Sequence, residues 1–365
     1  MCKGVFMNVK NYNFGQVGYR GRGKGLASFV VEAKGAQLVA IADLVGENLE
    51  DAKSLYSNIN VYSNHLDMIE AENLDVLIIA TAPRFRLPIV TDAVQKGVKA
   101  IYMEKPIANT LAEADQMISL CKDNRVELSI GHQRRWDPNF VNIKNAIKNG
   151  DLGTITHGVS YWTAGRIGAN GTHFLDMINF VLDDEPIRIS GISQFGMNNK
   201  ADFNESLNEW MEKDPGVSGF IDYSRGTRIW IHCFNDVITP HTHMFCGTKG
   251  RIDVFEGMGE FDMDILYRAS DKDSTDMRGV HIVEPKQFPV VTVDKKPESL
   301  AYEELIRVVS ERKNNSSTGE DGRKALEMIV AFQISSENGG RSVALPLPES
   351  CFNYEVGYHP NKSGK

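Results

Sequence analysis

Short apolar segments alternate with longer amphipathic ones over residues 13–130, and this alternation restricts the fold more than any other feature of the chain. The apolar segments have strand length and the segments between them have helical periodicity, a pattern typical of parallel α/β sheets. We expect strands at residues 14–17, 37–42, 76–80, 99–102 and 127–130. Because residues 76–80 (VLIIA) are apolar throughout, we place that strand in the centre of the sheet. The pattern predicts a doubly wound α/β domain.

Local signals mark where the helices of this region begin and end. Thr110 and Glu113 have the spacing of a capping box, which predicts a helix start. Gly35, Gly97 and Gly150 follow helical segments at positions where a left-handed residue closes a helix.

The pattern changes after about residue 150. Longer, often alternating strands are expected at residues 154–161, 219–223, 228–234 and 251–255, followed by helices at 298–313 and 320–336. This half predicts an α/β domain with a large, open, mostly antiparallel sheet. We therefore divide the chain into residues 1–130 and 131–365. The late helices fit either domain, and the polar residues 314–319 between them are interpreted as a surface turn.

Composition excludes several classes of protein. The 365 residues are 42% hydrophobic and 24% charged, as in a globular protein of two domains. A net charge of -8 argues against nucleic acid as a partner. The five cysteines show no C-x-x-C spacing, and no apolar stretch approaches a membrane span. We expect a cytoplasmic protein without a membrane partner.

A glycine-rich segment, Gly18-Tyr19-Arg20-Gly21-Arg22-Gly23, follows the first predicted strand and opens a helix. It approaches the G-x-G-x-x-G phosphate loop of dinucleotide-binding folds, in which glycine lets the backbone come close to the pyrophosphate. Arg20 occupies the second glycine position, and the other reading is a glycine-rich turn before a helix.

Asp43 supports the cofactor interpretation, because it ends the second predicted strand twenty residues beyond Gly23. An acidic side chain there accepts hydrogen bonds from ribose hydroxyls and repels a 2′-phosphate. We therefore expect NAD rather than NADP, although Arg20 and Arg22 lie close enough in sequence to favour the phosphate.

From about residue 13 to 347 the chain resembles the family of glucose-fructose oxidoreductase and inositol dehydrogenase, Gfo/Idh/MocA. The resemblance rests on motifs in a fixed order: the glycine loop, Asp43, Ile79-Ala80-Thr81-Ala82-Pro83, Glu104-Lys105-Pro106, Gly131-His132-Gln133-Arg134-Arg135, Gly171-Thr172-His173, Gly247-Thr248-Lys249-Gly250-Arg251 and Gly319-Glu320-Asp321-Gly322.

The resemblance implies an NAD(P)-dependent dehydrogenase or reductase that acts on CH–OH groups. It assigns cofactor contacts to residues of these motifs: Gly18, Arg20, Gly21, Arg22, Gly23, Asp43, Thr81, Pro83, Glu104, Lys105 and Gln133. Lys105 follows a predicted strand at the edge of the sheet where ligands bind, and its ammonium can stabilise a developing alkoxide. His173 matches the family's general acid/base.

Two departures from the family pattern affect the substrate site. Many members carry an aspartate four residues before the histidine, where this chain has Ala169, and Asn170 or Tyr161 are candidates to orient the imidazole or contact substrate. Many relatives also carry histidines at the positions of Arg84 and Arg86.

Arginine can bind a phosphate or carboxylate, so the second departure raises the hypothesis of an anionic substrate. Arg134 and Arg166 are further candidates for that role; the alternative is that all these arginines cap helices or form ion pairs. Trp162 could offer an apolar face to a sugar ring, although tryptophan is more often a core residue.

His241 and His243 alternate along a predicted strand near Asp236 and are a possible pair of metal ligands. Without an evident third ligand, and because the family reaction needs no metal, we expect none.

Three functions remain open. The first is hydride transfer between nicotinamide and a secondary alcohol or ketone carbon of a sugar, polyol, sugar acid or glycoside. The second is an NAD-dependent glycosidase or lyase that oxidises a sugar ring transiently, and the third is an inactive dinucleotide-binding regulator. The resemblance also implies a homodimer or homotetramer in which a second subunit covers the open sheet.

Overall fold

A computed structural model describes residues 11–163, 165–193, 202–204, 209–211, 214–234, 240–257, 263–269, 284–291 and 294–356. The chain forms two compact units. The first comprises Met1–Ala108, Glu113–Trp136 and Asp294–Gly322, and the second comprises Asn109–Ala112, Asp137–Val293 and Arg323–Lys365. The division of the sequence at residue 130 did not include the return of Asp294–Gly322 to the first unit.

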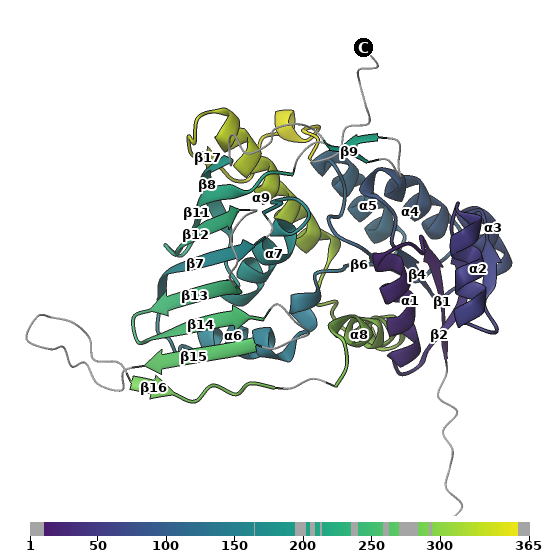
Figure 1. Cartoon of the computed structure of the whole chain (residues 1–365), viewed down its shortest axis with the longest axis horizontal. Helices are drawn as coiled ribbons and strands as arrows, with labels where there is room; N and C mark the ends of the chain where they lie inside the picture. Colours follow the sequence, from purple (N-terminus) through teal and green to yellow (C-terminus); the bar gives the residue numbers. More distant parts are fainter. Residues whose placement is uncertain are drawn as a thin grey trace, which may run out of the picture. The chain divides into compact units, whose positions relative to one another are not determined.

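The first unit is built on a six-stranded parallel sheet of order β3-β2-β1-β4-β5-β6 (Figure 1). The strands are β1 (Tyr12–Val17), β2 (Ala36–Ala42), β3 (Asn60–Tyr62), β4 (Val76–Ile79), β5 (Ala100–Met103) and β6 (Glu127–Ile130). Every residue of β4 is buried, as the continuous apolar run predicted. The strand order reverses between β1 and β4, and ligands bind at such a point in doubly wound sheets.

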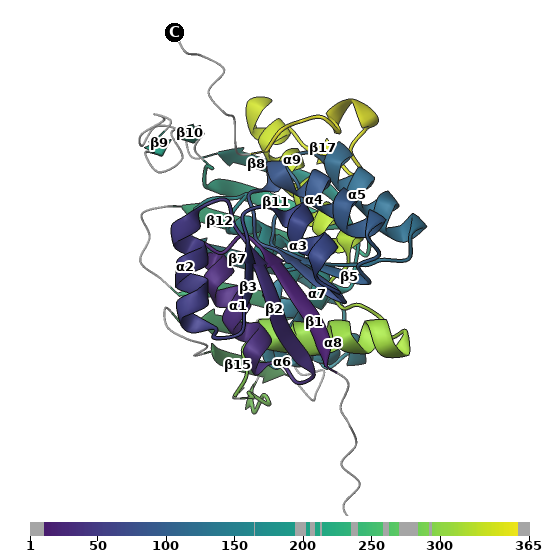
Figure 2. The same cartoon turned by 90° about the vertical axis from the view of Figure 1, so that its right-hand side faces the viewer.

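Helices cover both faces of this sheet. They are α1 (Arg22–Glu32), α2 (Gly46–Leu55), α3 (His65–Ala71), α4 (Arg86–Gln95), α5 (Leu111–Asp123) and α8 (Pro297–Glu311), with the short turns η1 (Pro83–Phe85) and η2 (Gln133–Trp136). Right-handed crossovers put α1 and α2 on one face and α3, α4 and α5 on the other (Figure 2).

Helix α8 joins the first unit from far along the sequence. Tyr302 of α8 packs on two aromatic residues of the sheet. The centroid of its ring lies 5.6 Å from that of Phe14 and 5.0 Å from that of Tyr102. Leu26 of α1 and Leu305 of α8 belong to the same buried cluster, so α8 lies on the α1 face of the sheet.

The segment before α9 (Gly319–Glu337) is not the surface turn that the sequence suggested. Ser317 is fully buried, its hydroxyl donates to the Ile130 carbonyl at 2.7 Å, and its carbonyl accepts the Ile130 N–H at 3.0 Å. Asn315 donates to the Leu128 carbonyl at 2.9 Å. The segment thus pairs with the edge of β6, where backbone groups would otherwise be unsatisfied.

The second unit contains a nine-stranded sheet of order β16-β15-β14-β13-β7-β12-β11-β8-β17. Its strands are β7 (Ile155–Thr163), β8 (Pro186–Ser193), β11 (Val217–Tyr223), β12 (Arg228–Phe234), β13 (His241–Gly247), β14 (Gly250–Glu256), β15 (Met263–Ala269), β16 (Glu284–Lys286) and β17 (Val343–Ala344). Only the β7–β12 pair is parallel among these neighbours, which confirms a mostly antiparallel sheet. A separate hairpin pairs β9 (Asp202–Asn204) with β10 (Glu209–Met211).

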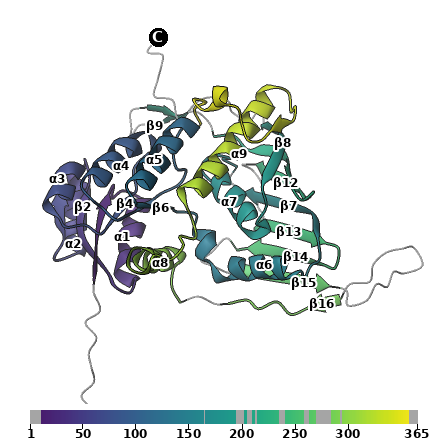
Figure 3. The ribbon, with the colours of Figure 1, turned by 180° about the vertical axis from the view of Figure 1, so that it is seen from behind.

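Helices α6 (Pro138–Asn149), α7 (Gly171–Leu182) and α9 pack on one face of this sheet (Figure 3). The ring of Phe174 on α7 stacks on Trp162 of β7 at 4.7 Å, and Ser335 of α9 accepts the Gly191 N–H of β8 at 2.9 Å. The opposite face keeps large apolar side chains exposed within the part of the chain that the structure describes, among them Trp230 and Leu266.

Candidate active site

The glycine loop connects β1 to α1 and has the close approaches that require glycine. A Cβ on Gly18 would lie 3.1 Å from the Ala80 backbone, and one on Gly23 would lie 2.5 Å from the Gly18 carbonyl oxygen. Gly18 also has a φ of +89°, in the left-handed region. Gln16 donates to the carbonyls of Gly18 and Gly23, at 2.8 and 2.7 Å. Arg20, at the position that usually carries glycine, is exposed.

Asp43 follows β2 and orders the turn around it. Its Oδ2 accepts the Tyr19 N–H at 2.7 Å, and its Oδ1 accepts the Val45 N–H at 2.9 Å and the Asn48 amide at 3.0 Å. A carboxylate oxygen offers two acceptor positions, so Oδ2 retains one for a ligand hydroxyl. The carboxylate therefore fixes the glycine loop and still presents negative charge beside it.

Arg22, the first residue of α1, is held by carboxylates of its own unit. Its Nε donates to Glu104 at 2.9 Å, and Nη2 donates to Glu298 of α8 and to Gln133 of η2, the latter at 3.3 Å. Burial disfavours the charged guanidinium, but Glu104 and Glu298 outweigh it and raise the pKa of Arg22. Arg22 therefore pairs with two carboxylates of the protein, whereas the sequence analysis considered it as a ligand of the 2′-phosphate of NADP.

Lys105 lies in the turn after β5, and its backbone is held by neighbours. The Glu104 side chain uses Oε1 for Arg22 and Oε2 for the Lys105 N–H, at 3.2 Å. Arg86 donates to the carbonyls of Glu104 and Pro106, the residues on either side. The turn is therefore fixed at three backbone positions around the side chain expected to do chemistry.

These residues fit a bound dinucleotide. Gly18 and Gly23 let the loop pack against the end of β4 and against itself, whereas a Cβ at Gly21 would meet nothing within 4 Å, which leaves open space beside the loop for a pyrophosphate. Thr81, two residues after β4, has a buried hydroxyl without a hydrogen-bond partner in the described structure, and η1 begins two residues later at Pro83. Such a hydroxyl at the carboxyl edge of a doubly wound sheet favours a polar ligand there.

In the second unit, α7 carries His173 in its first turn. Of the twelve residues of this helix, all of which the structure describes, His173 alone is not buried. The helix is otherwise apolar or internally bonded; Asn179, for example, accepts a hydrogen bond from Tyr223 at 2.8 Å. The imidazole of His173 is partly exposed at the start of a helix whose other residues are buried, and a purely packing role would not require this exposure.

The loop before α7 is organised by Asp214, a residue that sequence reasoning missed. Its carboxylate accepts the Gly168 N–H at 2.7 Å and the Ala169 N–H at 2.6 Å. It also lies 3.9 Å from Nε of Arg166. A carboxylate therefore stands beside Ala169, although it comes from 45 residues further along the chain. No local motif signals it.

Tyr161 cannot orient His173. Ser160 and Trp162 point toward the helices, because Ser160 bonds to His243 and Trp162 stacks on Phe174 of α7. Strand alternation puts Tyr161 on the opposite face. Asn170 caps α7, and its carbonyl accepts the His173 N–H at 3.1 Å.

Trp162 is 2% exposed, and its indole N–H donates to the Gly165 carbonyl at 3.0 Å. Trp162 is therefore a core residue that holds the loop before α7. Its proposed stacking on a sugar has no support in this geometry.

The two strand histidines have protein partners. His243 is fully buried, with Nδ1 2.8 Å from the Ser160 hydroxyl and Nε2 2.8 Å from Glu256. His241 accepts the Thr163 N–H at 3.3 Å. Asp236, the third residue of the metal hypothesis, lies outside the described residues. Within those residues no group of three His, Cys, Asp or Glu side chains is placed to hold a metal.

The arginines proposed to bind an anion are mostly occupied within the protein. Arg86 is 2% exposed and bonds to carbonyls, Arg134 is 9% exposed in η2, and the guanidinium of Arg84 lies over the Phe85 ring at 4.7 Å. Arg86 is therefore not a substrate ligand, because burial and its carbonyl bonds leave no room for a carboxylate.

The first unit has the glycine loop, acidic residue and switch-point topology of a dinucleotide-binding Rossmann domain, joined to a second unit with an open antiparallel sheet. Two family models match the chain: the NAD-binding Rossmann fold of the Gfo/Idh/MocA oxidoreductases over residues 12–132, and the C-terminal α/β domain of that family over residues 144–345. The chain belongs to this family of NAD-binding oxidoreductases.

Two relatives that match part of the chain are named as dehydrogenases. The chain is 32% identical over 162 residues to a D-apiose dehydrogenase of Paraburkholderia graminis, which is 44% of this chain and 43% of that protein. It is 32% identical over 118 residues to a myo-inositol 2-dehydrogenase of Thermotoga maritima, 32% of this chain and 35% of that one. The chain thus matches less than half the length of these relatives.

A solved structure shares the fold over nearly the whole chain. An oxidoreductase from Agrobacterium radiobacter, solved in complex with NAD+, L-tartaric acid and magnesium, has a TM-score of 0.74 at 17% identity and covers 92% of this chain and 98% of its own. Among the helices of the described residues, none has both the length and the apolar character needed to cross a membrane.

Proposed function

We propose that this protein is an NAD-dependent dehydrogenase of a polyhydroxylated substrate, with Lys105 and His173 as its catalytic residues. The observation that carries the proposal is the Lys105 turn, which Glu104 and Arg86 hold at the carboxyl edge of a dinucleotide-binding sheet. The names of the relatives, D-apiose and myo-inositol dehydrogenases, favour a sugar or polyol.

Lys105 and His173 divide the chemistry at the substrate hydroxyl. The Lys105 ammonium donates a hydrogen bond to the reacting oxygen and stabilises the negative charge that develops on it. The His173 imidazole takes the hydroxyl proton as the alcohol becomes a ketone, and returns it in the reverse direction. A dinucleotide bound at the glycine loop would supply the redox chemistry, as the acceptor of a hydride from the alcohol carbon.

NAD fits the cofactor site better than NADP. Asp43 keeps negative charge beside the glycine loop, and Arg22 is neutralised by Glu104 and Glu298. Arg20 is the remaining exposed cation of the loop. A 2′-phosphate would meet the Asp43 carboxylate, whereas a ribose hydroxyl can donate to it.

Activity on a panel of polyols, sugars, sugar acids and glycosides tests the proposal, with NADH formation followed by absorbance. We expect steady NADH production on at least one compound, and a loss of kcat by at least about 100-fold in Lys105→Met and in His173→Ala. Lys96→Met, which removes an exposed lysine of the first unit, is the matched control.

Two other outcomes would reject the proposal in favour of the alternatives. Product formation without net NADH supports a glycosidase or lyase. NAD binding without turnover of any compound supports a regulator.

We also propose that a second copy of the chain covers the open face of the nine-stranded sheet. Four side chains form a row across adjacent strands on that face, which we call the outer row: Phe220, Trp230, Val159 and Met244. Trp230, in the middle of the outer row, is 47% exposed, which is unusual for a large aromatic side chain in a monomer.

A cytoplasmic location is proposed as well, supported by free thiols at Cys121, Cys233, Cys246 and Cys351.

A further inference from the structure

Arg86, the first residue of α4, is a buried cation with an unusual set of partners. It is 2% exposed, and its guanidinium reaches three backbone carbonyls. Nε and Nη2 donate to the Thr81 carbonyl at 3.0 and 2.8 Å, and Nη1 donates to the carbonyls of Glu104 and Pro106. Four of the five N–H groups of an arginine are used in this way.

These carbonyls belong to the two segments that the cofactor and substrate are expected to meet. Thr81 follows β4, and Glu104 and Pro106 flank Lys105 after β5. One guanidinium therefore joins the Thr81 segment to both sides of the Lys105 peptide. The planar fork of arginine spans three acceptors that the single ammonium of a lysine would not reach together.

Burial makes this arrangement expensive. It lowers the pKa of Arg86 to about 10, partly opposed by the nearby Glu104 carboxylate, and the side chain keeps its charge at neutral pH. A buried charge bonded only to neutral carbonyls costs solvation free energy that a packed apolar side chain would not cost. The carbonyls themselves would be left buried without donors if the guanidinium were removed.

We propose that Arg86 is a positioning residue for Lys105, acting through the backbone on either side of it. This inference rests on the proposed function, in which the Lys105 ammonium contacts the reacting oxygen. Arg86 itself touches neither substrate nor cofactor. Its role is to hold the turn in one conformation before any ligand binds, which lowers the cost of bringing the ammonium to the oxygen.

The main test replaces the fork with an uncharged amide in Arg86→Gln and compares kcat with NADH affinity. We expect kcat to fall about 100-fold, the loss typical of a misplaced catalytic group, while the Kd for NADH measured by fluorescence changes less than about threefold. Arg307→Gln, which removes an exposed arginine from α8 of the same unit, is the control and should match the parent protein in both quantities.

Arg86→Lys separates charge from geometry. It keeps the cation but cannot span three carbonyls, so kcat should remain at least about tenfold below the parent value. Full activity in Arg86→Lys, or unchanged kcat in a folded Arg86→Gln protein, would overturn the proposal. If Arg86→Gln does not fold, Arg86→Lys decides alone. A fall in kcat matched by an equal fall in NADH affinity would also reject it, because that result describes a damaged cofactor site.

A second measurement needs no substrate and distinguishes this inference from the proposed function. Amine-specific labelling followed by mass spectrometry gives the rate at which Lys105 reacts, with exposed Lys53 as the internal reference. A loosened turn in Arg86→Gln should change the Lys105 rate relative to Lys53 by at least about threefold, even if the parent protein oxidises nothing. An unchanged ratio would show that Arg86 does not hold the turn.

Discussion

Single carboxylates connect several parts of the first unit. Glu104 binds Arg22 of the glycine loop with one oxygen and the Lys105 N–H with the other. Because Arg22 also binds Glu298 of α8, the start of α1, the Lys105 turn and a helix from late in the chain share one charge network. Glu104 and Glu298 are both buried, so loss of Arg22 would remove the cation that pairs with each of them, and the network stabilises this arrangement over alternatives.

At the scale of one residue, Asp43 is the side chain that we propose selects NAD over NADP. In Asp43→Asn the side chain keeps its shape and an acceptor oxygen but loses its charge. The ratio of kcat/KM for NAD to that for NADP should fall by about tenfold, since a phosphate no longer meets a carboxylate. Steady-state kinetics with both cofactors measure this ratio.

The control is Glu50→Gln, which removes a carboxylate from the exposed surface of α2. In this variant, the ratio of kcat/KM for NAD to that for NADP should equal the ratio of the parent protein. An unchanged ratio in Asp43→Asn would mean that Asp43 only orders the loop through its bonds to Tyr19 and Val45.

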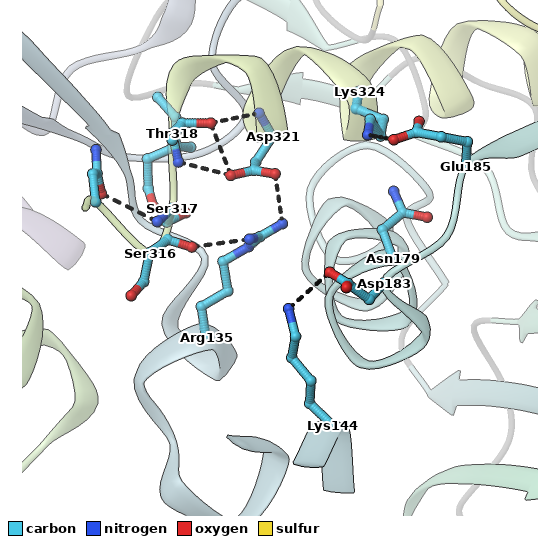
Figure 4. A network of polar contacts seen from close by, with 12 residues as sticks. Arg135, Lys144, Asn179, Asp183, Glu185, Ser316, Ser317, Thr318, Asp321 and Lys324 are labelled. Atoms are coloured by element: carbon cyan, nitrogen blue, oxygen red, sulfur yellow. Dashed lines mark hydrogen bonds and ion pairs between the residues drawn. The ribbon is translucent and has the colours of Figure 1, made fainter. Parts of the chain in front are cut away.

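At the scale of elements, the start of α9 shows how a polar segment is tied to the sheet. Thr318 and Asp321 cap each other reciprocally, with the Asp321 N–H donating to the Thr318 hydroxyl at 3.2 Å and the Thr318 N–H to Asp321 at 2.9 Å. Arg135 of η2 pairs with Asp321 at 3.0 Å and donates to the Ser316 carbonyl at 2.9 Å (Figure 4). These bonds fix the end of the segment that pairs with β6.

This pair predicts a pH-dependent stability. Burial alone would raise the pKa of Asp321, but Arg135 and the Thr318 bonds outweigh it and lower that pKa. A lowered pKa contributes stability above the unfolded value of about 4, and this contribution is lost as the pH falls through the folded value. Asp321→Asn should therefore lose about 2–3 kcal/mol of unfolding free energy near neutral pH, and much less near pH ~3. Urea unfolding at both pH values measures the difference.

Glu320→Gln, the adjacent exposed carboxylate of α9, controls for loss of charge at the helix start. It should cost less than about 1 kcal/mol at either pH, because the favourable interaction with the helix dipole that it removes is opposed by a repulsion from Glu127. An equal loss for Asp321→Asn at both pH values would contradict an ionic origin of the effect.

The elements that the sequence predicted are those with strong local signals. The all-buried β4 reads as a continuous apolar run, and the late helices appear as α8 and α9 within a few residues of their expected ends. The three-residue β3 was missed, because so short an edge strand has no periodicity to detect. The glycine loop was found because its close approaches demand glycine at Gly18 and Gly23.

The partners of site residues were much less predictable. Glu298 meets Arg22 across 276 positions of sequence, and Asp214 meets Ala169 across 45. Nothing local distinguishes these acids from surface residues, since their roles depend on where the chain returns. The hypothesis that Arg86 binds an anion failed for the same reason: two of its three carbonyl partners come from a turn eighteen and twenty residues away.

At the scale of the whole molecule, the open sheet face is the surface that we propose contacts a second copy of the chain. Strand alternation gives the face a central apolar row flanked by charged residues that pair among themselves, such as Arg188 and Arg228 on Asp222. Asp222 pairs with both arginines, and among the described residues Trp230 is the largest of the exposed apolar side chains. Such a face favours self-association.

Trp230→Lys tests this assembly. In a two-fold interface each copy presents the same residue, so the change brings two ammonium groups into an apolar contact and removes two indole rings. We expect the parent protein to sediment as a dimer or tetramer and the variant to dissociate with a Kd raised by at least about 100-fold. Leu55→Lys, which alters a residue 64% exposed at the end of α2 in the other unit, should leave the assembly intact. A monomeric parent protein, or a Trp230→Lys variant that sediments like the parent, would show that the outer row is not the contact between copies.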